Sequence, residues 1–214
     1  MGIVTLAIFV GGIFLFSRAG TSTNVVNSAL LVPQNAIVTS GFANGNYLPA
    51  SPSASVTLVE FGDYECPACG LYSPLTKQLL TDFAGKINYI FRNYPLPQHK
   101  NANISSYAVE AAGLQGKYLE MHEKMYATQG DWSNLSYPTS VFVGYAEGFG
   151  LNVDQFTTDI NLPAVKDKVK SDFNDGNTIG ITQTPTFYLN GKKVTLSGSY
   201  DQLKGLIESA LAGK

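Results

Sequence analysis

Apolar positions change their spacing several times along the chain, and the order of these changes predicts an α/β protein. Residues 56–62 (VTLVEFG) form a β-branched and aromatic run that predicts a strand. Apolar residues then recur at helical spacing up to Phe83, and Gly85 can end that helix. A second strand is expected at residues 87–94 (INYIFRNY), before a Pro-Leu-Pro stop. The first half therefore reads as a βαβ unit.

Helical patterns dominate the next part of the chain. They cover residues 101–113, 117–128, 139–149, 154–160 and 163–176. Strands return at 186–189 and 193–196, on either side of Asn190-Gly191, which is the strongest short hairpin signal in the sequence. A final helix is expected around Leu203 to Leu211. The predicted order is βαβ, a helical block, a ββ hairpin and a last helix.

The N-terminal fifty-five residues divide into two parts. Residues 3–16 (IVTLAIFVGGIFLF) are apolar and uncharged, but they fall short of the ~20 residues that a straight helix needs to cross a bilayer. Residues 1–20 are therefore expected to be a membrane anchor or a signal segment, with a buried helix as a third alternative. No basic residue precedes the apolar run. Charged residues upstream of this sequence would explain that absence. Residues 21–55 read as a linker with a possible edge strand at 36–39, and residues 56–214 as the folded domain.

Composition narrows the classes of protein. Of the 214 residues 44% are apolar and 14% are charged, which is typical of a packed globule, and the net charge of −2 argues against a nucleic-acid partner. Both cysteines lie in one Cys-x-x-Cys pair, Cys66 and Cys69. A zinc site would need a second ligand pair, and the two histidines, His99 and His122, are far apart. The pair is best interpreted as a redox centre, with no cofactor and no metal.

The position of the pair suggests how it reacts. Cys66 lies where the predicted helix begins, so unpaired N–H groups and the helix dipole favour its thiolate. We expect Cys66 to be the nucleophile, with a pKa below the usual value of about 8.5 but not extremely low. Cys69, one turn into the helix, would resolve the mixed disulfide.

Three motifs, in this order, resemble the thioredoxin fold, and more narrowly its DsbA-like branch with an inserted helical domain. They are VTLVEFGDYECPACG at 56–70, YPLPQHKNA at 94–102 and GITQTPTFYLNGK at 180–192. The resemblance spans residues 56–214 and implies a helical insertion at about 98–178. It also implies an extracytoplasmic enzyme, periplasmic or on the cell surface, that is membrane-anchored or secreted. Such an enzyme acts on protein or peptide thiols and has a membrane or small redox partner.

The same resemblance assigns roles to three further residues. Glu60 would lie beneath the cysteines and relay a proton to the inner thiol; the alternative is a solvated side chain at a sheet edge. Thr184-Pro185 matches the cis-proline loop, whose backbone pairs with an extended substrate. The alternative there is an ordinary trans proline at the start of a strand.

Four other residues near the cysteines carry weaker expectations. Strongly oxidising relatives have a histidine between the cysteines, where this chain has Ala68. His99 has a packing role or, as the second alternative, a catalytic one. Asp63 and Glu65 are interpreted as solvated turn residues.

These observations favour an enzyme that introduces disulfides into exported proteins. A reductase or isomerase of the same fold remains the first alternative. A binding module or chaperone with a structural disulfide is the second. In that case Cys66 would be buried and slow to alkylate after reduction.

Overall fold

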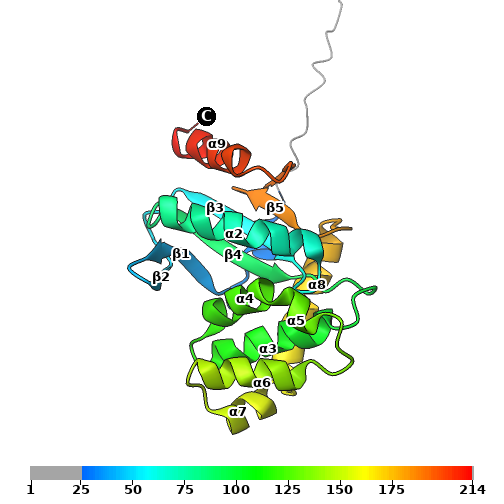
Figure 1. The fold of residues 1–214 in the computed structure, drawn as a ribbon. Coiled ribbons are helices and arrows are strands. Elements are labelled where there is room, and N and C mark those ends of the chain that lie inside the picture. The colour runs from blue at the N-terminus through cyan, green and yellow to red at the C-terminus, as the bar shows by residue number, and fades with distance from the viewer. Residues whose placement is uncertain (1–25, 214) are drawn as a thin grey trace, which may run out of the picture.

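The computed structural model describes residues 26–213, so the predicted anchor or signal segment lies outside the described part. Within this range six strands form one sheet in the order β2-β1-β4-β3-β5-β6 (Figure 1). The strands are β1 (Val38–Ala43), β2 (Asn46–Pro49), β3 (Val56–Gly62), β4 (Ile87–Asn93), β5 (Thr186–Leu189) and β6 (Lys192–Val194). The centre of the sheet is β3, parallel to β4 and antiparallel to β5. Its position explains why its sequence is an almost continuous apolar run.

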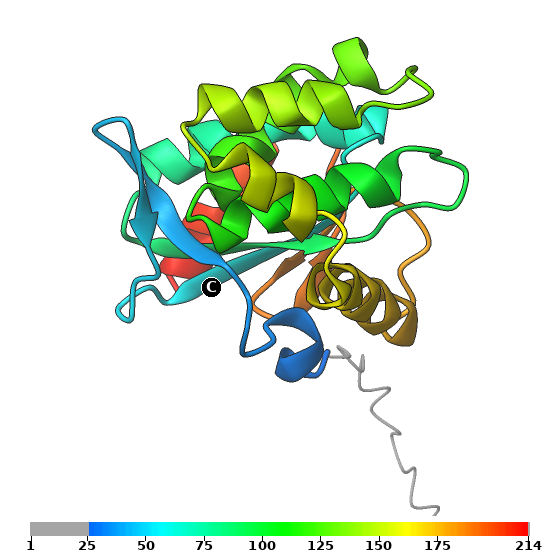
Figure 2. The ribbon, with the colours of Figure 1, turned by 90° about the horizontal axis from the view of Figure 1, so that it is seen from below.

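Helices cover both faces of the sheet. The described helices are α1 (Ser28–Leu31), α2 (Pro67–Asp82), α3 (Ala102–Leu114), α4 (Tyr118–Ala127), α5 (Gln129–Trp132), α6 (Thr139–Gly148), α7 (Val153–Asp159), α8 (Pro163–Thr178) and α9 (Tyr200–Leu211). Helix α2 runs across one face, and α9 packs beside it (Figure 1). Helices α1 and α8 lie together against the other face (Figure 2). None of the helices between residues 26 and 213 is long and apolar enough to cross a membrane.

Side chains of the central strands alternate between two cores. Val56 and Leu58 belong to the core under α2 and α9, whereas Val59 and Phe61 face α1 and α8. This is the period-two pattern of a strand buried on both sides. Helices α3 to α8 fill the chain between β4 and β5, as the pattern predicted.

The interpretation of residues 21–55 as a linker is wrong for much of its length. Strand β1 is an inner strand that pairs with β4 as well as β2, and the predicted edge position belongs to β2. The turn between them is Asn44-Gly45, with φ of 52° and 80°, the same geometry as the predicted Asn190-Gly191 turn. Gly41 lets β1 pass close to α2, because a Cβ there would lie 2.6 Å from both Leu80 O and Ala84 Cα.

Candidate active site

The two cysteines lie at the junction between β3 and α2. Strand β3 ends at Gly62, a short turn follows, and Cys66 is the N-cap residue of α2, with Pro67 in its first turn. Pro67 fits this place because the first helical N–H has no partner within the helix. Cys69 is fully buried and Cys66 is 6% exposed, and both are free thiols. The structure thus places the pair as the sequence predicted, one turn apart at a helix start.

The surroundings of Cys66 favour its thiolate. Its pKa is lowered to about 5, first by a hydrogen bond from the Cys69 thiol and then by Thr184 and the N–H groups of Cys69 and Ala68, while burial opposes the change. The direction agrees with the sequence-based expectation. The largest cause is the second thiol, however, and the N–H groups of the helix start contribute less.

Cys69 is affected in the opposite way. Burial raises its pKa well above the usual value, and the hydrogen bond to Cys66 and the charge of Glu60 act in the same direction. One sulfur is therefore stabilised as a thiolate and the other as a thiol. This asymmetry is what a nucleophile and a buried resolving thiol require.

Glu60 lies inside the protein, on β3, and not at an edge of the sheet. It is 2% exposed, and its Oε2 accepts a hydrogen bond of 2.7 Å from the Tyr89 hydroxyl. Burial raises its pKa to about 7; the Tyr89 bond lowers it and the charge of Cys66 raises it further. The solvated alternative is thereby excluded, and the carboxyl can gain and lose a proton near neutral pH.

The loop before β5 closes over the nucleophile. The Thr184-Pro185 peptide bond is cis. The Cys66 thiol donates to the Thr184 carbonyl at 3.4 Å. The Thr184 hydroxyl has no partner of normal geometry among the described residues, yet it is close enough to the sulfur to lower its pKa. Cys66 is only 6% exposed, which is the burial expected of a structural disulfide, whereas its lowered pKa is what a nucleophile requires.

The expectation of solvated turn residues is wrong for Asp63. Its carboxylate is fully buried and accepts bonds from the N–H groups of Glu65 and Leu96, and His99 Nδ1 lies 2.7 Å from it. Glu65 is partly buried and accepts from the Asn101 N–H. The loop after β4 folds back over the turn and supplies the contacts from Leu96, His99 and Asn101. His99 thus contacts the turn before Cys66 through Asp63.

Gln129 is a site residue that the sequence did not reveal. Its amide Nε2 donates to the carbonyls of Tyr64 at 2.7 Å and Cys66 at 2.9 Å. It belongs to α5, more than sixty positions from the motif, so no local pattern connects the two. Through it the helical insertion holds the turn before α2.

A comparison with protein families agrees with this geometry. A family described as Thioredoxin matches residues 49–209, which is most of the described chain. The chain belongs to the thioredoxin family. All the site residues named above, from Glu60 to Pro185, lie inside this match.

Solved structures confirm that this thioredoxin-family chain has the DsbA-like fold. The crystal structure of alpha-DsbA1 from Wolbachia pipientis has a TM-score of 0.71 at 23% identity, over 87% of this chain and 96% of that one. BdbD from Bacillus subtilis, in its oxidised form, has a TM-score of 0.67 at 23% identity, over 83% and 93%. At these identities the likeness shows the fold alone.

The sequence relatives are much longer than this chain. A Na(+)/H(+) antiporter NhaA 1 from Salinispora arenicola is 37% identical over 161 residues, which are 75% of this chain and 24% of that protein. A protein of the same name from Mycobacterium sp. (strain KMS) is 34% identical over 69% of this chain and 24% of its own. The chain spans about a quarter of the length of these curated relatives.

Proposed function

We propose that this chain is a protein thiol–disulfide oxidoreductase that oxidises thiols of exported proteins. The observation that carries the proposal is the lowered pKa of Cys66, about 5, beside the raised pKa of Cys69. The pKa of Cys66 is lower in the folded, reduced protein than in the unfolded chain, so its thiolate stabilises the folded, reduced protein above the unfolded pKa. This stabilisation is lost as the pH falls through about 5. At neutral pH the reduced form is therefore the favoured one, which makes the disulfide an oxidant.

The reaction follows from the two sulfurs. A substrate thiolate attacks Cys66 Sγ of the oxidised pair, the S–S bond breaks, and its electron pair passes to Cys69 Sγ. Cys69 takes up a proton, for which the Glu60 carboxyl is the nearby acid. A second substrate thiolate then attacks the substrate sulfur of the mixed disulfide, and Cys66 leaves as a thiolate. The substrate is oxidised and the pair is reduced.

The surroundings of the pair support a substrate of extended polypeptide. The Thr184-Pro185 loop lies against Cys66, and a backbone there can pair with a substrate strand whatever its side chains are. The DsbA-like fold supports an extracytoplasmic location and a redox partner that re-oxidises the pair, by analogy of fold. Anchoring through residues 1–20 remains part of the proposal.

The test is the reduction potential of the pair in a glutathione series. We expect a value well above the roughly −270 mV of thioredoxin, together with oxidation of a dithiol peptide. A value near or below it would instead support the reductase alternative. Cys69→Ser should trap a mixed disulfide when its Cys66 thiolate attacks the disulfide form of the peptide and releases one peptide thiolate, whereas Cys66→Ser should not react. Slow alkylation of reduced Cys66 at pH 6 would favour a structural disulfide.

A further inference from the structure

The side-chain amide of Gln129 bridges two carbonyl groups of the active-site turn. Its Nε2 donates to Tyr64 O at 2.7 Å and to Cys66 O at 2.9 Å, so both amide hydrogens are used. These contacts define the orientation of the amide, because the opposite one would place Oε1 against two carbonyl oxygens. One side chain therefore holds the two peptide groups that enclose Glu65 and Cys66.

The peptide group after Cys66 has a single hydrogen-bonding atom. Pro67 has no N–H, so the Cys66 carbonyl is the only polar group of that peptide unit that can be held. This carbonyl accepts from the Gly70 N–H at 3.1 Å within α2 and from Gln129 outside it. On the other side of the residue, the Cys66 N–H donates to Asp63 O at 3.1 Å. Together these bonds fix the backbone where α2 begins.

Gly70 leaves room for the amide beside α2. A Cβ built on Gly70 would lie 3.0 Å from Gln129 Oε1, 3.4 Å from its Cδ and 3.5 Å from its Nε2. Gly70 lies inside α2, where glycine is less favourable than alanine. A Cβ on Gly144, inside α6, would meet nothing within 4 Å. The close approach of the amide is a physical reason for a glycine at position 70.

The place of Cys66 decides which donors its sulfur meets. The Cys69 thiol, and then Thr184 and the N–H groups of Cys69 and Ala68, lower the pKa of Cys66. These donors belong to α2 and to the loop before β5, so they act together only if the N-cap residue keeps its place relative to both. In a disulfide the S–S bond itself fixes the sulfur, whereas for the free thiols of this structure the backbone must do so.

We propose that Gln129 is a positioning residue, whose amide holds Cys66 where the thiolate of the reduced pair is stabilised and thereby makes the disulfide a stronger oxidant. The inference deepens the proposed function and rests on it. Gln129 acts through the two carbonyls and not on the sulfur itself. Because Gln129 is the first residue of α5, the helical insertion contributes in this way to the reactivity of a pair that lies outside it.

The test removes the amide and titrates the cysteine in the reduced full chain. Gln129→Met keeps an unbranched side chain of similar length and loses both donated hydrogens. We expect the pKa of Cys66, measured from thiolate absorbance, to rise by about one unit, the order of one lost hydrogen bond. The reduction potential at pH 7 should fall by about 30 mV, which corresponds to a tenfold change in the equilibrium constant. A role in stability alone would move neither quantity.

The matched control is a second glutamine that binds backbone groups inside the insertion. Gln115 Nε2 donates to Asn152 O at 3.2 Å, and its Oε1 accepts from Asn152 N at 2.9 Å. Gln115→Met loses the same kind of contact away from the cysteines. It should leave the pKa of Cys66 and the reduction potential unchanged.

Gly70→Ala perturbs the same contact from the side of α2. Its methyl group should push against the amide and raise the pKa of Cys66, by less than Gln129→Met does, because a side chain can shift. In a Gln129→Ala background the methyl group has no amide to meet, so Gly70→Ala should then leave the pKa unchanged. Gly144→Ala, where the added methyl group meets open space, is the control and should not change the pKa.

Three outcomes would each overturn the inference. They are an unchanged pKa in Gln129→Met, an equal rise in Gln115→Met, and a rise in Gly70→Ala that persists without the amide. If Gln129→Met does not fold, Gly70→Ala decides alone, and an unchanged pKa there would overturn the inference. A wild-type potential near the roughly −270 mV of thioredoxin would count against the proposed oxidase. The difference between variant and wild type could still be measured, so the two failures are distinguishable.

Discussion

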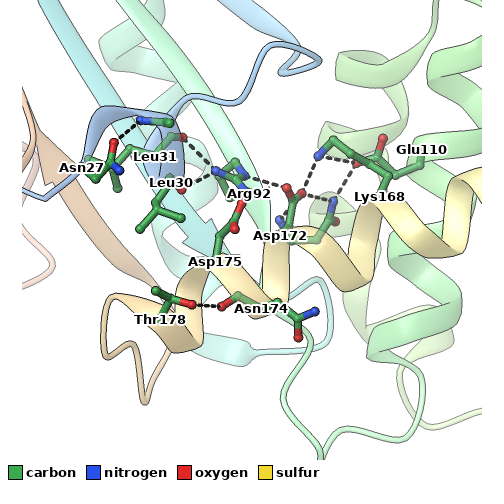
Figure 3. A network of polar contacts seen from close by, with 12 residues as sticks. Asn27, Leu30, Leu31, Arg92, Glu110, Lys168, Asp172, Asn174, Asp175 and Thr178 are labelled. Carbon is green, nitrogen blue, oxygen red and sulfur yellow. Dashed lines mark hydrogen bonds and ion pairs between the residues drawn. The ribbon is translucent and has the colours of Figure 1, made fainter.

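The protein buries ionisable side chains on both faces of its sheet, and the two groups differ in how they are paired. On the side of α1 and α8, Arg92 is fully buried and bonds Asp172 and Asp175, both at 2.6 Å (Figure 3). Lys168 reaches Asp172 at 2.6 Å, and Arg92 also donates to the carbonyls of Leu30 and Leu31. Each charge in this network meets an opposite charge or a carbonyl.

On the side of α2, the redox group has no such partners. Within residues 26–213, no cation forms an ion pair with Glu60, Cys66 or Cys69. Burial without a counter-ion raises the pKa values of Glu60 and Cys69, whereas hydrogen bonds to its sulfur lower the pKa of Cys66 in spite of burial. The comparison teaches that paired charges hold the fold together, whereas buried groups without counter-ions remain free to exchange protons.

The largest expected effect on stability comes from the paired side. Arg92→Met leaves Asp172 and Asp175 without their shared cation, and two carbonyls lose a donor. We expect the free energy of unfolding to fall by about 3–5 kcal/mol, measured by urea denaturation. The Cys66 pKa and the rate of reduction by dithiothreitol should stay the same. A parallel loss of reactivity would show that the two faces are coupled.

If that variant does not fold, Asp175→Asn offers a milder version. Asp175 is 23% exposed, so water can replace part of its ion pair with Arg92. The loss of stability should be clearly smaller, and again without any change in reactivity. Equal losses for the two variants would contradict the assignment of the penalty to buried, unpaired charge.

The sequence predicts the redox group far better than the paired network. Cys66, Cys69 and Glu60 lie within ten positions, on a strand and the helix that follows, so local spacing places them. Thr184-Pro185 is distant but stands in a motif of its own. Arg92 and Asp172 are 80 positions apart and meet only because α8 packs on β4. Nothing in either local pattern selects that partner.

The N-terminal side of the chain also carries a local turn signal. The same Asn-Gly turn that predicted the β5–β6 hairpin also stands at Asn44-Gly45, between Phe42 and Tyr47. The polar composition of residues 21–55 hid it. The facing aromatic pair, with ring centroids 4.9 Å apart, is the cross-strand contact that accompanies such a turn.

The next effect concerns Glu60 and depends on pH. Its folded pKa, about 7, is above the usual value of 4.5, so the native state holds the proton more tightly than the unfolded chain. Stability therefore falls as the pH rises between these values. Glu60→Gln removes this loss of stability at high pH. At pH 8 the variant should be more stable than the wild type by about 3 kcal/mol at most. At pH 4 it should be no more stable than the wild type. Denaturation of the reduced proteins at both pH values measures this difference in the free energy of unfolding.

A matched control is Glu120→Gln, since Glu120 lies in an exposed pair. It should show no such gain at pH 8. A Glu60→Gln protein that is less stable than the wild type at pH 8 would contradict the raised pKa.

A smaller effect is expected at the loop over Cys66. Thr184→Val keeps the branched shape and removes the hydroxyl that helps to lower the pKa of Cys66. We expect that pKa to rise by less than about one unit, which is no more than about 1.4 kcal/mol, and the disulfide to become less oxidising. Thiolate absorbance against pH measures the change. Thr186→Val is the control, because its hydroxyl bonds the Gln183 carbonyl instead, and it should leave the pKa of Cys66 unchanged.

The smallest effect should come from an ion pair that is not buried. Lys117 and Glu120 lie 2.8 Å apart, only slightly farther than the 2.6 Å pairs of the network, but their side chains are 40% and 37% exposed. Water screens this attraction, and Lys117 also lies at the N-terminus of α4, where the helix dipole disfavours a cation. Lys117→Ala should therefore change the free energy of unfolding by less than about 0.5 kcal/mol, in the same urea measurement used for Arg92→Met. A loss near that of Arg92→Met would mean that distance alone, and not burial without a replacement partner, sets the strength of the network.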